Sequence, residues 1–148
     1  MASAIPNRSL YNIFFAYMSG KDIRARLVMT NTTCDTEIDA ITNLSDYTTI
    51  DVCDATGYAD VALDTETITE NDTDNRADFD AVADAVFSSL SGNATRDIQG
   101  VLLYQYVDGT DANDIPLSFI DFSVDLPKEA TQITIPASTT NLIQASQG

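Results

Sequence analysis

The sequence contains no histidine and no tryptophan, and its six glycines are scattered singly. Without histidine, the commonest general base, the Ser–His and Cys–His nucleophile pairs and histidine metal sites are all missing. No glycine lies in a GxGxxG or GxxxxGK[ST] arrangement that would bind phosphate groups. Paired carboxylates of the kind that cleave glycosides occur in any chain this acidic, and no tryptophan is present to stack on a sugar. We therefore expect no enzymatic activity and no cofactor.

One acidic segment begins like a calcium-binding loop. Asp72 and Asp74 have the D-x-D spacing of an EF-hand, but Arg76 occupies the third ligand position. Ala77 replaces the glycine, and Ala83 stands where the bidentate glutamate belongs. The motif fails, so we expect no metal site. The alternative to solvated loop acids is a looser oxygen cage drawn from Asp51, Asp54, Asp72 and Asp74.

Cysteines and long apolar runs are also scarce. Cys34 and Cys53 match no metal-ligand spacing, and we expect two reduced, half-buried thiols, with a bridge between them as the alternative. The N-terminal residues lack the charged region of a signal peptide, and the longest apolar run, residues 13–18, is too short to span a membrane. We expect synthesis in a cytosol and no membrane association.

Charge is distributed unevenly along the chain. The first 30 residues hold four of the seven basic residues and a single acid, Asp22. Residues 31–148 hold three basic residues against 22 acids, within a formal net charge of −16 for the whole chain. A surface of that sign repels phosphate backbones and anionic lipid. We expect no nucleic-acid partner, and a partner that contacts either the basic start or apolar surface.

The length of 148 residues predicts one domain, residues 1–148, able to bury roughly 70% of the surface of its unfolded chain. Within it we expect an N-terminal arm and helix, residues 1–22, and a β-rich body, residues 23–148. Residues 30–56 are polar and rich in Thr and Asp, and are predicted to form a long loop with one or two helical turns. So long a connection indicates a working surface.

An amphipathic helix is predicted over residues 8–19. Asn7 is a candidate N-cap, and Gly20 is placed to end the helix. The apolar face either packs on the protein's own sheet, which is the favoured interpretation, or serves as an exposed docking face. Its residues recur at i, i+3, i+4 and i+7: Leu10, Ile13, Phe14 and Tyr17.

The helix is followed by a segment with the period of a half-buried strand. In residues 23–29, apolar side chains alternate with Arg24 and Arg26, which places both arginines on one outward face. Two guanidinium groups on one strand face form a plausible contact for an anion. An equally favoured alternative is that both arginines pair with the protein's own carboxylates.

Short strands are predicted along the rest of the chain from β-branched and aromatic runs bounded by turn residues. Residues 98–107 and 117–126 flank the turn cluster 108–111 and should form a core hairpin, whereas alanines favour a helical turn over residues 81–86. Around a charged turn at residues 71–78, the other expected strands are residues 58–63, 66–69, 133–135 and a last strand at Leu142 and Ile143. This pattern predicts a mainly β fold, an antiparallel β-sandwich or partly open barrel with one N-terminal α-helix.

Several short motifs are spread from residue 23 to the C-terminus. They are TCDTE at 33–37 with DA at 39–40, TTID at 48–51 leading to GY at 57–58, DFDA at 78–81, QGVLLY at 99–104, and PL at 116–117 before IDF at 120–122. Together they resemble a family of small virion proteins encoded among the structural genes of tailed bacteriophages. In that family an N-terminal helix precedes a β-domain, and the members look like capsid decoration, or cement, proteins. None of the motifs is catalytic.

The resemblance implies a structural protein on the capsid exterior, made in the host cytoplasm. Its partners would be the major capsid protein and further copies of itself, with a trimer favoured. The alternative is a virion appendage or tail-associated module that binds a host surface glycan or receptor, and the number of copies per particle separates the two. The candidate capsid or subunit contacts lie in and just after the basic start: Arg8, Phe14, Tyr17, Lys21, Arg24 and Arg26.

Overall fold

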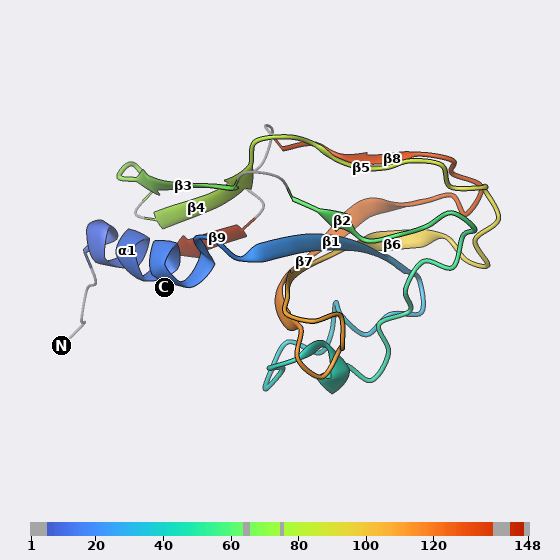
Figure 1. Ribbon diagram of the computed structural model, residues 1–148, viewed down its shortest axis with the longest axis horizontal. Coiled ribbons are helices and arrows are strands. Elements are labelled where there is room, and N and C mark those ends of the chain that lie inside the picture. The colour runs from blue at the N-terminus through green and yellow to red at the C-terminus, as the bar shows by residue number, and fades with distance from the viewer. Residues whose placement is uncertain (1–5, 64–65, 75, 138–142, 147–148) are drawn as a thin grey trace. The chain divides into compact units, whose positions relative to one another are not determined.

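The computed structural model describes residues 6–63, 66–74, 76–137 and 143–146 (Figure 1). It is mainly β, with antiparallel sheets and a single N-terminal α-helix among these residues, so the predicted fold class is confirmed. The chain divides into two compact units. The first unit comprises residues 1–21, 64–84 and 136–148, and the second comprises residues 22–63 and 85–135. The single domain expected from the chain length stays a prediction.

Helix α1, Asn7–Met18, forms in the first unit where the sequence predicts a helix. Asn7 is the first helical residue and not the N-cap, so its predicted role is wrong. The cap position is Pro6, whose carbonyl oxygen accepts the N–H groups of Ser9 and Leu10 at 2.9 and 3.1 Å. Gly20 follows the helix with φ of +72°, the left-handed conformation that glycine adopts at no steric cost.

The buried side of α1 is rotated from the predicted one. Met18 is buried, and the Phe14 ring packs edge-on against Phe79 with 6.4 Å between ring centroids. Ile13 and Tyr17 remain 63% and 48% exposed. The favoured interpretation, packing on the protein's own sheet, therefore holds for Phe14 and fails for Ile13 and Tyr17.

A three-stranded sheet, in the order β3-β4-β9, completes the first unit. Its strands are β3, Glu66–Asn71, β4, Arg76–Ala81, and β9, Ile143–Ser146. The last strand is confirmed at Ile143, and Leu142 lies outside the described residues. The charged turn predicted at residues 71–78 is shorter in the structure. Asn71 and Arg76 are paired as neighbouring residues of β3 and β4, so the turn lies between them.

The helical turn predicted over residues 81–86 is wrong. Ala81 ends strand β4, and strand β5 occupies Ala85–Phe87. Strand β4 is hydrogen-bonded to β3 on one side and β9 on the other, with Phe79 fully buried. Tertiary pairing and burial here outweigh the helix propensity of alanine, which is worth less than about 1 kcal/mol per residue.

The second unit contains a four-stranded antiparallel sheet in the order β2-β1-β6-β7 (Figure 1). The predicted strand at residues 23–29 and the core hairpin are confirmed, whereas the strand predicted at residues 58–63 is reduced to two residues. A two-stranded ribbon of β5 and β8 belongs to the same unit and confirms the strand at residues 133–135. The bounds are β1, Asp22–Met29, β2, Val61–Ala62, β6, Ile98–Tyr106, β7, Ile115–Leu126, and β8, Ile133–Ile135.

The long loop at residues 30–56 is confirmed and forms part of the core. Its only helical turn is a 3-10 turn, Leu44–Asp46, and no strand lies within it. Leu44 and Cys34 from the loop are buried against Leu102 and Tyr104 of β6. The loop therefore covers one face of the sheet, which explains why successive residues of β6 are buried on both faces.

Both cysteines are free thiols, so the expected reduced state is confirmed, and both are buried where half-burial was expected. Burial raises the pKa of Cys34 and of Cys53, because a thiolate is poorly solvated there. Neutral thiols at these positions act as small apolar core groups.

Replacing Leu103 by Asp should unfold the second unit. Leu103 is 0% exposed in the middle of β6, and an unpaired buried carboxylate costs several kcal/mol, on the order of 3 or more. Val124→Asp is the matched control, because Val124 is 76% exposed on β7. Circular dichroism during heating measures both variants, and a Leu103→Asp protein that melts like the wild type would contradict this placement of β6.

Candidate functional site

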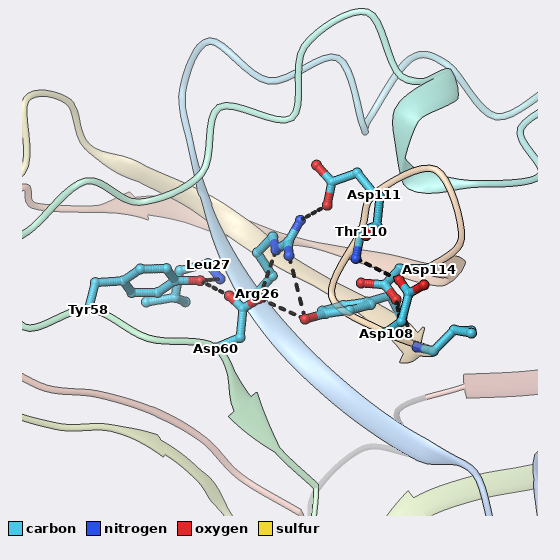
Figure 2. Close-up of polar contacts among 10 residues, drawn as sticks. Arg26, Leu27, Tyr58, Asp60, Asp108, Thr110, Asp111 and Asp114 are labelled. Carbon is cyan, nitrogen blue, oxygen red and sulfur yellow. Dashed lines mark hydrogen bonds and ion pairs between the residues drawn. The ribbon is translucent and has the colours of Figure 1, made fainter.

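The most organised polar group in the second unit is a cluster around Asp60 (Figure 2). Asp60 lies just before β2, Arg26 projects from β1, and Tyr104 projects from β6. Tyr58 comes from the segment before β2, and Asp111 comes from the loop between β6 and β7. We call these five residues the Asp60 cluster.

The carboxylate of Asp60 is the acceptor at the centre. The Tyr58 hydroxyl donates to Oδ1 at 2.5 Å, and the Tyr104 hydroxyl donates to Oδ2 at 2.7 Å. Nε of Arg26 donates to Oδ2 at 2.9 Å, which adds an ion pair. The side chains of Arg26 and Asp60 are only 12% and 17% exposed. Three donors therefore satisfy one nearly buried carboxylate.

Further bonds extend the cluster to the backbone and to a second loop. The Tyr58 hydroxyl accepts the backbone N–H of Leu27 at 2.9 Å, and the other side of the Arg26 guanidinium donates to Asp111 at 3.0 Å. The guanidinium carbon also lies 4.7 Å from the centroid of the Tyr104 ring. The cluster thus ties two central strands to the segment before β2 and to the β6–β7 loop.

Strand register explains how the sequence assembles this group. Arg24 and Arg26 alternate on β1, as Tyr104 and Tyr106 do on β6, and the antiparallel pairing sets Arg24 opposite Tyr104. Each guanidinium lies over a diagonal neighbour, with Arg24 3.4 Å from the Tyr106 centroid and Arg26 over Tyr104. Such diagonal pairs across antiparallel strands are within reach of long side chains.

Gly57 sets the chain direction just before Tyr58. Its φ is +88°, and a Cβ at this position would collide with the backbone oxygen of Ser89. Only glycine, which has no Cβ, can adopt this φ and come this close to the backbone of Ser89. The Tyr58 ring then stacks on Phe87, with 6.1 Å between centroids, which fixes the direction in which its hydroxyl points.

The two tyrosines and Arg26 of the cluster all have raised pKa values. Burial and the neighbouring Asp60 raise the pKa of both Tyr58 and Tyr104, so both hydroxyls remain donors. Burial alone would lower the pKa of Arg26, but attraction to Asp60 and hydrogen bonds to Asp111 and Asp60 outweigh it and raise the pKa. Such an arrangement braces the fold.

Carboxylates also organise the loops beside the cluster. Glu37 accepts the Thr33 hydroxyl at 2.8 Å, and the N–H and hydroxyl of Thr48 at 2.7 and 2.6 Å. These bonds, those from Thr48 first, lower the pKa of Glu37 because they favour its charged form. In the β6–β7 loop, Asp114 is fully buried and accepts the Val107 N–H at 2.7 Å (Figure 2).

The six candidate contact residues fall into both units. Arg24 and Arg26 lie together on β1, and the structure shows the alternative in which both pair with the protein's own carboxylates. Arg24 contacts Asp22 at 2.8 Å, and its side chain is 29% exposed. A contact between either arginine and a capsid stays a prediction.

The other four candidates belong to the first unit. Arg8 is 69% exposed and contacts Glu70 at 3.1 Å, an exposed pair of the kind that contributes little stability. Phe14 is turned toward Phe79, whereas Tyr17 and Lys21 are exposed. Exposed surface for a partner therefore remains at Arg8, Tyr17 and Lys21.

The acids considered for a loose calcium cage have other roles. Asp51 pairs with Arg96, whose Nε donates at 3.0 Å, and Asp54 accepts the Thr95 hydroxyl at 2.7 Å. Asp74 contacts Arg76 at 3.1 Å. Within the described parts of the chain, no group of three or more Asp, Glu or Cys side chains is placed to hold a metal ion. No helix there is long and apolar enough to cross a membrane.

Sequence reasoning found Arg26 and missed Tyr58, Asp60, Tyr104 and Asp111. The alternation of two arginines and two tyrosines on separate strands was a usable signal, because such residues meet when the strands pair. No local pattern marks Asp111, which reaches Arg26 across 85 positions of sequence.

Comparison with known proteins finds no matching family model, no similar curated protein and no similar solved structure.

Replacing Arg26 by Glu should lower the melting temperature by on the order of 10 °C. The change leaves Asp60 without its cation and adds a like charge, and breaking a buried pair costs about 3 to 5 kcal/mol. Lys21→Glu makes the same charge change at an exposed position and should melt close to the wild type. Equal melting temperatures for both variants in differential scanning calorimetry would contradict the bracing role.

Replacing Glu37 by Gln should lower stability at pH 7 and have no effect in acid. Because the folded pKa of Glu37 lies below its unfolded value, its contribution is complete above the unfolded pKa and disappears as the pH falls through the folded pKa. The difference in melting temperature from the wild type should therefore begin to shrink below about pH 4.3, the ordinary pKa of glutamate, and should vanish only below the lower folded pKa. Asp39→Asn, at an exposed position in the same loop, is the control and should melt close to the wild type at pH 7.

Proposed function

We propose that this protein is a structural virion protein that decorates the outer surface of an icosahedral phage head and stabilises it. The proposal rests on two independent kinds of support. One is the set of motifs that resemble small virion proteins of tailed phages. The other is the chemical character of the best organised polar group in the fold.

The Asp60 cluster is the structural observation that supports the proposal. Its polar atoms bond to one another, and its two tyrosines keep their protons because burial and Asp60 raise their pKa. A site that must react with a substrate needs a group that changes protonation or attacks an atom. The Asp60 cluster instead holds β1 and β6 and two connecting segments in one arrangement. A protein that reinforces an assembly needs a rigid fold of this kind.

The charge distribution suits attachment to the outside of a particle. The body is strongly acidic and is repelled by packaged nucleic acid, whereas the basic start offers Arg8 and Lys21 to a partner. Such attachment would combine a Coulomb part with apolar contacts. The Coulomb part weakens as salt shortens the Debye length to about 3 Å near 1 M.

The number of copies per virion tests the proposal. Purified particles, analysed by quantitative gel densitometry against the major capsid protein, should contain this chain in hundreds of copies, as symmetry over an icosahedral surface requires. A handful of copies per particle would overturn decoration in favour of an appendage that binds a host receptor. Heated particles that lack the chain should also lose their contents at a lower temperature than complete particles.

A further inference from the structure

A hollow of about 190 Å³, lined mainly by apolar residues together with Ser118 and the Tyr47 side chain, lies in the second unit between the long loop and strand β7. Loop residues form one wall, and successive residues of β7 form the other. No member of the paired strand β6 lines it. The residues concerned are Cys34, Ile38, Ile41, Tyr47, Pro116, Leu117, Ser118 and Phe119.

The strand residues place this hollow at the edge of the sheet. Alternate residues of a strand point to opposite faces, so four successive residues can line one hollow only where it lies beside the strand. Strand β7 is the outermost strand of the β2-β1-β6-β7 sheet. The hollow is therefore open beside an outer strand, where a partner can approach.

Size decides what the hollow can hold. Sites for drug-sized molecules usually measure about 300 Å³ or more, whereas an apolar cavity of about 150 Å³ accepts a benzene ring. At about 190 Å³ the hollow matches one aromatic or large aliphatic side chain. Ile38 at its margin is 77% exposed, and an apolar group of this size is usually covered when a partner binds.

The surroundings of the hollow are acidic. Asp35 and Asp39 are exposed in the loop wall, and Asp121 is exposed two residues beyond Phe119 on β7. No Lys or Arg occurs between residues 27 and 75. The complementary surface should therefore present an apolar side chain next to a cation.

The first unit presents such a surface on α1. Ile13 and Tyr17 are spaced i, i+4 on one side of the helix, and Lys21 lies in the segment just after the helix, three residues beyond Met18. Ile13 and Tyr17 are 63% and 48% exposed, and Lys21 is exposed, with no ion-pair partner in the described parts of the chain. We call these three residues the helix ridge.

We infer that copies of this chain associate head to tail, with the helix ridge of one copy seated in the hollow of a second copy. The Tyr17 ring has the size to enter the hollow, and Lys21 then lies near Asp35 and Asp39. The two surfaces differ, so the contact is heterologous, and it yields a ring if the rotation between copies closes. This inference names a contact between copies and holds whether or not the protein decorates a capsid.

A contact made by one ridge and one hollow is small. Interfaces that bury less than about 1,200 Å² are typically weak and transient, so association should depend on concentration. A surface that holds many copies side by side would raise their effective concentration and strengthen the same contact.

Two single variants and their mixture test the inference by sedimentation velocity of the full chain. Tyr17→Glu damages only the ridge and Ile38→Glu damages only the hollow, and both side chains are exposed, so each variant should fold and remain monomeric. An equimolar mixture should form a dimer and nothing larger, because each variant supplies the surface that the other lacks. Val124→Glu, at a 76% exposed position outside both surfaces, should associate like the wild type.

Charge exchange provides a second measurement. Lys21→Glu should weaken association, and combining it with Asp39→Lys should restore it. A wild type that is monomeric at every concentration, or single variants that still associate, would overturn the inference. A mixture that stays monomeric would also overturn it. These results are obtained without capsids, so their failure is separate from a low copy number on the virion, which would overturn only the proposed function.

Discussion

The second unit depends on one nearly buried carboxylate, that of Asp60, and on the three side chains that donate hydrogen bonds to it. Asp60 receives Arg26 and two tyrosine hydroxyls within hydrogen-bond distance, and its partners come from β1, β6 and the segment before β2. Each connection on its own closes a long loop at an entropic cost. Because the bonds meet at the carboxylate of Asp60, in a region of low dielectric, they reinforce one another. Together they hold the segment before β2 and the β6–β7 loop against the sheet.

The long loop, residues 30–56, is also held in place by hydrogen bonds to carboxylates. A segment of this length without regular structure usually remains on the surface because its backbone polar groups need water. Here side chains replace water: Glu37 binds Thr33 and Thr48, and Asp46 caps the 3-10 turn at its start. With these groups satisfied, Leu44 and Cys34 can be buried against β6. The loop thus becomes a covering layer, and one hollow lies where it passes the edge of β7.

The excess of acids acquires a structural meaning from these contacts. Many of the carboxylates serve as acceptors for backbone N–H groups, hydroxyls and a side-chain amide. These bonds lower the pKa of Glu37, Asp46 and Asp54, and the amide of Asn113 contributes most to lowering the pKa of Asp108. The acidic side chains therefore stabilise the loops by accepting hydrogen bonds, and they also make the surface negative. The few cations are divided between bracing, as with Arg26, and exposure, as with Lys21.

The sequence by itself determined the elements whose signal is local. The period of residues 23–29, the apolar run of β6 and the stop at Gly20 each lie within one element, and each forms as predicted. Only the tertiary structure decided which side of α1 is buried, because that depends on where Phe79 lies. It also decided that residues 81–86 are not helical and that Arg26 meets Asp60 and Asp111, 34 and 85 positions away. Strand pairing and burial are long-range effects, and they outweigh local propensities that are worth less than about 1 kcal/mol per residue.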